Sequence, residues 1–204
     1  MTSKIFKYLN IKSSGFIQHQ KAFGAGFTLI ETLIAVLLLA MSIAGPLTIA
    51  SKGLTSTLVA KDQFVGFYLA QDAIEQVRFL RDSSCLATPG DSTGCPVGVW
   101  LQGLNNCLTS VNPDGCYLDS LATNPTSPVA CTGGVCQTMR YDTTNHVFNY
   151  NQAVPLTPQR FIRTIKITNT TPDEAVITVE VNWVDRAGIT RVPIKVSEHI
   201  FRWQ

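Results

Sequence analysis

The sequence has few charged residues and carries no motif of a common enzyme class. Aspartate, glutamate, lysine and arginine make up 15% of its 204 residues, and it has only three histidines. The patterns G-x-S-x-G, H-E-x-x-H and the P-loop are all absent. His146 and His199 have no motif partner, so we expect both on strand or turn surfaces. The sequence therefore predicts a protein that is not an enzyme and that needs no cofactor.

Basic residues do not gather into a surface for nucleic acid. Residues 1–26 contain Lys4, Lys7, Lys12 and Lys21 and no acidic residue, whereas the rest of the chain has 12 basic and 14 acidic residues. A region so close to neutral, without cations interleaved among aromatics, offers no basic surface to a phosphate backbone. Nucleic acid is not expected as a partner.

Charge is absent from the twenty residues 32–51. A helix of this length extends roughly 30 Å, at about 1.5 Å per residue, and so matches the hydrocarbon core of a bilayer. Residues 27–51 are therefore predicted to cross a membrane once. The lysines precede the span and Lys52 is the only cation soon after it, which places the N-terminus in the cytoplasm and the remainder outside.

Gly45 and Pro46 interrupt this apolar run. Proline lacks the amide hydrogen that would bond the Ser42 carbonyl, and its ring crowds the same carbonyl. We therefore expect a kink or a melted turn of helix at this point.

Helical periodicity continues beyond the span, and predicts a second helical half over residues 52–82. Its apolar stripe recurs every three, four or seven residues: Leu58, Val65, Leu69, Ala73, Val77 and Leu80. Phe64, Phe67, Tyr68 and Phe79 lie largely off the stripe. Two explanations stay open for these aromatic residues, a wide apolar arc beneath one domain or a second face that contacts other subunits.

Residues 83–136 form an insert with no lysine or arginine, five of the ten prolines and seven of the fourteen glycines. All six cysteines lie in it: Cys85, Cys95, Cys107, Cys116, Cys131 and Cys136. An even number of cysteines in an exported segment predicts a disulfide framework, for which fifteen connectivities are open. No C-x-x-C pair or suitably spaced histidine suggests a metal site. Because short closures form most easily, we expect sequential pairing.

The insert is expected to be irregular and to lack a core of its own. The stretch N112-P-D-G115 predicts a turn between Cys107 and Cys116. Exposure of Val99, Trp100 and Tyr117 would favour an adhesive surface in this region.

Residues 137–204 carry strand patterns. They occur in four stretches: 137–150, read as a hairpin about Thr143 to Asn145, then 161–169, 175–184 and Ile189 to about Trp203. Pro193 limits part of the last strand to an edge or a bulge. The fold class is therefore α+β, with a long N-terminal helix packed on an antiparallel sheet of about four or five strands and a disulfide-rich loop insert.

A specific motif begins the apolar run. In G24-A-G-F-T-L-I-E-T-L-I-A-V36 a lysine-rich leader ends at Gly26, Phe27 follows, and Glu31 is the fifth residue after that glycine. This motif resembles that of type IV prepilins. Residues 68–82, YLAQDAIEQVRFLRD, are similar to the first helix of PilV-like minor pilins and of type II secretion pseudopilins, and the V-E-V-N-W-V-D-R-A-G-I-T-R pattern is a looser match.

The resemblance implies a route of processing and assembly, and the pilin fold. In this family a membrane-embedded prepilin peptidase cuts after the glycine, here Gly26, and methylates the new amine, here that of Phe27. Residues 1–26 would be the removed leader and residues 52–204 the globular pilin domain. A carboxylate at mid-bilayer costs on the order of 2.5 to 3.5 kcal/mol. In this family the glutamate, here Glu31, is thought to pair with the N-terminus of the neighbouring subunit.

The resemblance also implies the partners and the location. The partners would be other pilin subunits through the first helix, the prepilin peptidase, the inner-membrane assembly platform, and membrane lipid before assembly. The globular domain would lie outside the cytoplasm, first anchored in the cytoplasmic membrane and then in an extracellular or periplasmic filament. The bulky insert favours a minor pilin over the major one. Two alternatives stay open, a minor pseudopilin of a type II secretion system or a membrane-anchored exported protein of another class.

Overall fold

The computed structural model describes residues 26–87, 95–96, 98–119, 127–157 and 160–202. The chain divides into two compact units, Met1–Ala50 and Ser51–Gln204, and each is described by itself. Of the predicted leader, residues 1–25 lie outside the described residues.

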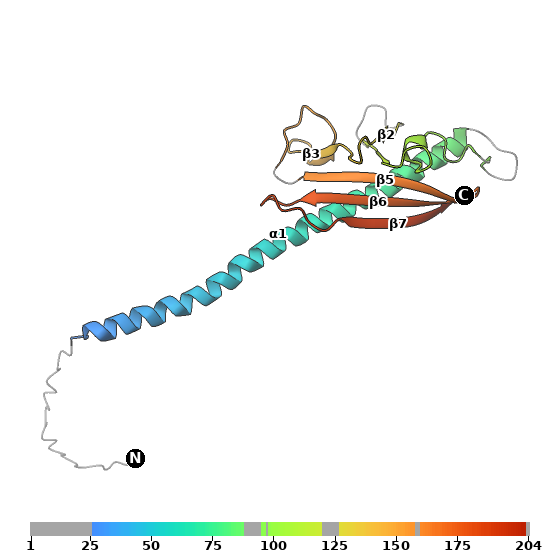
Figure 1. Ribbon diagram of the computed structural model, residues 1–204. Coiled ribbons are helices and arrows are strands. Elements are labelled where there is room, and N and C mark those ends of the chain that lie inside the picture. The colour runs from blue at the N-terminus through green and yellow to red at the C-terminus, as the bar shows by residue number, and fades with distance from the viewer. Residues whose placement is uncertain (1–25, 88–94, 97, 120–126, 158–159, 203–204) are drawn as a thin grey trace, which may run out of the picture. The chain divides into compact units, whose positions relative to one another are not determined.

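Helix α1 spans Leu29–Ala87 and contains Pro46 (Figure 1). The expectation of a melted turn at Gly45 and Pro46 is wrong, because the helix continues through both residues. One side-chain donor lies close to the proline. The Thr48 hydroxyl donates hydrogen bonds to the Gly45 carbonyl at 2.7 Å and to the Ala44 carbonyl at 3.2 Å. An opened turn in an apolar stretch would leave further backbone groups unpaired, which favours the intact helix.

The C-terminal end of α1 also differs from the prediction. The helix was expected to end at residue 82 and ends at Ala87, so Cys85 lies on the helix and not in a loop. The irregular part of the insert therefore begins later than expected.

The sheet is antiparallel and is built around β5. Its strands are β1 (Cys116–Tyr117), β2 (Val129–Ala130), β3 (Thr138–Asp142), β4 (Val147–Asn149), β5 (Arg160–Thr171), β6 (Glu174–Val184) and β7 (Ile194–Phe201). β5 pairs with β6, and β6 pairs with β7. β5 also pairs with β1 and with β3. In turn, β2 pairs with β1 and β4 pairs with β3. The α+β class is confirmed: β3 to β7 come from the predicted strand region, and the insert adds two short strands.

The turns explain where the strands end. In the β3–β4 hairpin, the Asp142 carboxylate accepts hydrogen bonds from the amides of Thr144, at 2.8 Å, and Asn145, at 3.2 Å. β7 begins at Ile194 instead of Ile189, because Pro193 has no amide hydrogen to donate to the sheet. Residues 185–193 therefore form a loop before β7, which is an edge strand as expected.

The second part of α1 packs on the sheet along the predicted stripe. Ala70, Ala73 and Val77 are fully buried, whereas Leu58 remains 43% exposed. Gly66 marks the closest approach, because a Cβ atom there would lie 2.6 Å from Ile194 Cδ1 on β7. Its lack of a side chain lets the helix and the edge strand come together.

The aromatic residues off the stripe are exposed. Phe64, Phe67, Tyr68 and Phe79 have exposed fractions of 66%, 42%, 65% and 62%. They do not form a wide buried arc beneath the sheet, and the explanation of a buried arc is therefore wrong.

The insert does not stand apart from the main core. Trp100, Leu104, Cys107, Cys116 and Leu118 are buried in the same hydrophobic cluster as the helix stripe and the sheet. Residues Asn105–Cys107 form the short 3-10 helix η1. Because Trp100 is 3% exposed, it supplies no adhesive surface.

The disulfides pair sequentially, as predicted. The bonds join Cys85 to Cys95, Cys107 to Cys116, and Cys131 to Cys136, with sequence separations of 10, 9 and 5 residues. The turn at residues 112–115 is also present inside the second loop, where the Gly115 amide donates to the Asn112 carbonyl at 3.1 Å.

Candidate functional site

The start of α1 leaves the predicted cleavage bond outside the helix. Gly26, Phe27 and Thr28 precede the first helical residue and are exposed. The Thr28 hydroxyl accepts a hydrogen bond from the Glu31 amide at 3.3 Å, and the Thr28 carbonyl accepts one from the Thr32 amide at 3.1 Å. Thr28 is therefore the N-cap residue of α1. The bond between Gly26 and Phe27 therefore lies outside the helix.

Glu31 has a local role at the start of α1 that was not predicted from the sequence. Thr28 and Glu31 are three residues apart at the start of a helix, which is the T-x-x-E pattern of a capping box. An acidic residue in the first turn also favours the helix because it faces the positive end of the helix dipole. Among the described residues no cation forms an ion pair with Glu31. Glu31 is exposed.

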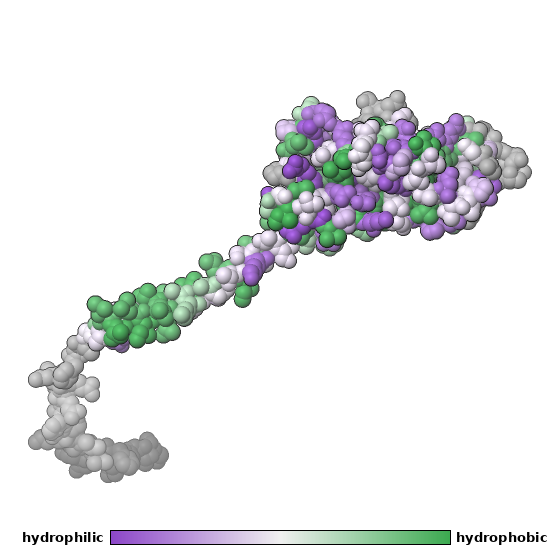
Figure 2. Space-filling model, in the orientation of Figure 1, coloured by the Kyte–Doolittle hydropathy of each residue, from purple (hydrophilic) through white to green (hydrophobic). Residues whose placement is uncertain are grey.

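The helix beyond Glu31 is apolar on every side. Figure 2 shows the apolar side chains along this part of the helix on the face in view. Large hydrophobic side chains around its circumference have exposed fractions between 54% and 78%: Leu29, Ile30, Leu33, Ile34, Val36, Leu37, Leu38, Leu39, Met41, Ile43, Leu47 and Ile49. By length and composition the helix is a candidate membrane span, and none of its most apolar stretch is buried within the chain. Such a helix requires lipid or other helices around it.

A buried arginine holds the second unit together. Arg163 on β5 is fully buried, and its guanidinium donates to the Leu69 carbonyl at 3.0 Å, to the Asp72 carboxylate at 2.6 Å and to the Leu118 carbonyl at 2.6 Å. These contacts join the helix, the sheet and the insert at one point. Burial also raises the pKa of the neighbouring Tyr150 hydroxyl to about 12, although the positive charge of Arg163 opposes that shift.

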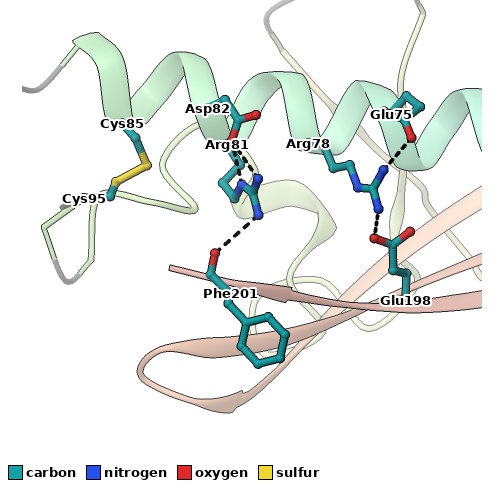
Figure 3. Close-up of polar contacts among 8 residues, drawn as sticks. All are labelled: Glu75, Arg78, Arg81, Asp82, Cys85, Cys95, Glu198 and Phe201. Atoms are coloured by element: carbon teal, nitrogen blue, oxygen red, sulfur yellow. Dashed lines mark hydrogen bonds and ion pairs between the residues drawn. A yellow bond between two sulfur atoms is a disulfide. The ribbon is translucent and has the colours of Figure 1, made fainter. Parts of the chain in front are cut away.

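Two arginines fasten the far part of α1 to the edge strand (Figure 3). Arg78 hydrogen-bonds Glu198 of β7, and it lies 2.6 Å from Glu75 on its own helix. The hydrogen bond to Glu198 is the main cause that raises the pKa of Arg78. The helix is thereby held against β7 by charge as well as by apolar packing.

The last turns of α1 make a second set of contacts, with β7 and with the insert. Arg81 donates to the Phe201 carbonyl at 3.3 Å and pairs with Asp82 at 2.8 Å, and one turn later Cys85 is bonded to Cys95 (Figure 3). Helix, edge strand and insert therefore meet at this end of the unit.

His146 and His199 lie on the surface, as the sequence predicted. The His146 ring is 3.2 Å from the Tyr141 hydroxyl at the hairpin, and His199 on β7 pairs with Glu174 at 2.6 Å. Within the part of the chain that the structure describes, no three histidine, cysteine, aspartate or glutamate side chains are grouped as metal ligands.

Comparison with known proteins adds no relative. The chain matches no protein-family model, no curated protein and no solved structure. The resemblance to prepilins therefore rests on the motif around Gly26, Phe27 and Glu31 and on the helix that follows it.

Proposed function

We propose that this chain is a structural subunit, a minor pilin, of a type IV pilus-like filament. A prepilin peptidase removes residues 1–26 and methylates the amine of Phe27. Before assembly the first part of α1 anchors the subunit in the membrane. The subunit polymerises when that part leaves the lipid and packs in a bundle of neighbouring helices.

One observation carries the proposal. A prepilin-like cleavage motif leads directly into a helix that is apolar all round, and the same helix continues as the packed backbone of an α+β globular unit. A simple membrane anchor needs only the first of these helical parts. The joining of both parts in one helix suits a subunit that repeats along a filament.

The details at the helix start support the same function. Gly26 and Phe27 lie outside the helix, where a peptidase can reach the bond between them. Glu31 carries an exposed carboxylate without a cation of its own among the described residues. In an assembled filament the methylated amine of the neighbouring Phe27 would supply that cation.

Mass spectrometry of the mature N-terminus tests the processing step. The full chain is expressed with and without a prepilin peptidase, and the membrane fraction is digested and sequenced from its N-terminus. We expect a methylated Phe27 only when the peptidase is present, and no processing of a Gly26→Leu variant. An intact leader in the presence of peptidase, or a cut between Ala44 and Ser51, would contradict the proposal.

A further inference from the structure

The second unit begins with a cluster of cations beside a loop. Ser51 and Lys52 follow the apolar part of α1 directly in the chain. A shallow groove there is lined by Ser51, Lys52, Thr55, Ser56, Val59 and Arg191. Arg191 belongs to the loop of residues 185–193, so this loop lies beside the first turns of α1 in the second unit. We call these turns, Ser51 to Asp62, and the loop together the basic end.

The acidic residues of the basic end are buried. Asp62 and Asp185 have exposed fractions of 3% and 5%. Asp185 accepts hydrogen bonds from the amides of Ala187 and Ile189, both at 2.9 Å, and pairs with Arg191 at 2.6 Å. These contacts shape the loop, and they leave no acid of the basic end exposed.

The cations and apolar residues of the basic end are exposed instead. Lys52, Lys61 and Arg186 are exposed, and none of them forms an ion pair among the described residues. The loop adds Ile189 and Val192, which are 52% and 85% exposed. Cations beside protruding apolar side chains are the combination that binds an anionic lipid surface.

The position in the chain identifies the occupant. Ser51 to Val59 rise about 12 Å along the helix from the end of the uncharged stretch, at about 1.5 Å per residue. The headgroup layer of a bilayer is roughly 5 to 8 Å thick on each side of the hydrocarbon core. Because it directly follows the uncharged stretch, Lys52 lies at headgroup depth whenever α1 spans the membrane, and Lys52 is one of the residues that line the groove with Arg191.

We propose that the basic end docks on anionic phospholipid headgroups of the membrane that α1 enters. Lys52 lies among the phosphates, Lys61 and Arg186 attract them from farther along the helix, and Ile189 and Val192 enter the interface. Docking holds the globular unit at the membrane surface and is released when the subunit leaves the membrane. The inference rests on the membrane span and not on polymerisation, so it holds for any protein anchored by this helix.

Photocrosslinking of the full chain in lipid nanodiscs tests the proposal. Val192 is replaced by the photoreactive residue p-benzoylphenylalanine, and discs are made of phosphatidylcholine alone or with phosphatidylglycerol added. Val111, which is 63% exposed in the insert, is the matched control position. We expect lipid adducts at position 192 that increase several-fold with phosphatidylglycerol, and a background level at position 111.

The double variant Lys52→Gln/Arg186→Gln measures the part played by charge. We expect the phosphatidylglycerol-dependent adducts at position 192 to fall about five-fold from the loss of Lys52, which lies at headgroup depth, and by less from the loss of Arg186. Equal labelling in both kinds of disc would overturn the proposal, and so would adducts to a second protein chain in place of lipid. Each of these outcomes leaves cleavage at Gly26 unaffected, so failure of the docking surface is separate from failure of the pilin proposal.

Discussion

The two parts of α1 are one helix with opposite surroundings. Before Ser51 its large apolar side chains are exposed on all sides, whereas after it Ala70, Ala73 and Val77 are fully buried against the sheet. The later part finds its packing partners within the chain. Among the described residues nothing covers the earlier part, and a helix that is apolar all round needs lipid or other molecules to cover it. The stability of the chain therefore resides in the second part, and the proposed intermolecular role in the first, so substitutions should separate the two.

The largest loss of stability is expected from Arg163→Met. The variant keeps much of the side-chain volume but removes the donor to the Leu69 and Leu118 carbonyls and one of the donors to the Asp72 carboxylate, which is 45% exposed and keeps Gln76. Each buried acceptor left without a donor costs about 1 to 3 kcal/mol, so the two carbonyls together give the largest expected loss. Thermal unfolding of the full chain in detergent, followed by circular dichroism, measures it. Lys166→Met on the opposite face of β5 is the control, and equal losses in the two variants would contradict the role of Arg163.

Removing the disulfide at the end of α1 should have the next largest effect. Replacing Cys85 and Cys95 together by serine opens a loop of 10 residues, for which chain entropy gives a loss of about 2 to 3 kcal/mol. The shorter loop between Cys131 and Cys136 should contribute slightly less. Unfolding midpoints of the two double variants compare them. A much larger loss from the shorter loop would show that the cysteines act through core packing.

The same substitution at two helix glycines should separate the packed face from the free one. Gly66→Leu places a side chain against Ile194, Val181 and Phe161, which typically costs about 1 to 3 kcal/mol. Gly53→Leu meets nothing within 4 Å and should stabilise the helix by a few tenths of a kcal/mol to about 1. Unfolding in the same detergent measures both variants. Similar effects of the two would mean that α1 does not pack on β7 at Gly66.

The smallest effect concerns pH and the loop before β7. The hydrogen bond from the Ile189 amide is the main cause that lowers the pKa of Asp185 below 3.8, and Arg191 adds to it. A lowered pKa in the folded state gives stability that is present above the unfolded value and is lost as pH falls through the folded value. Asp185→Asn should therefore weaken the fold at neutral pH and flatten the acid dependence below about pH 4. A parallel loss of stability in both proteins below that pH would contradict this account of the loop.

Local patterns in the sequence predicted much of this fold. The three- and four-residue spacing gave the buried stripe of α1, strand alternation with turn residues gave the β3–β4 hairpin, and short spacing gave the three disulfides. Each of these features depends on residues close together in the chain. They were predictable because local geometry restricts the conformations that such residues adopt.

The missed features depend on contacts between distant residues or on competing local effects. Alternation places Arg163 on the inward face of β5 with Phe161 and Ile165, but its acceptors on α1 and in the insert lie far away in the sequence. The close approach of Gly66 to Ile194 likewise joins residues far apart in the sequence, so no local pattern predicts it. The proline rule predicted a kink or a melted turn, and the melted turn is wrong because the intact helix around Pro46 keeps more backbone groups paired.

Glu31 is where local structure and proposed function overlap, and the overlap can be resolved. If the residue only caps the helix, glutamine should replace it, because glutamine also serves at this position of a capping box. If its charge pairs with the amine of a neighbouring Phe27, glutamine should fail as alanine does. Losing one side of a buried ion pair costs about 3 to 5 kcal/mol.

The most direct measurement is the amount of this subunit in sheared filaments relative to membranes, for the wild type, Glu31→Gln and Glu31→Ala. Cleavage at Gly26 and membrane insertion should remain largely intact in both variants, because they depend on the leader and the apolar run. We predict that both variants accumulate in the membrane and are strongly depleted from filaments. Wild-type incorporation of Glu31→Gln would show that capping is the whole role of Glu31, and would contradict assembly through its charge.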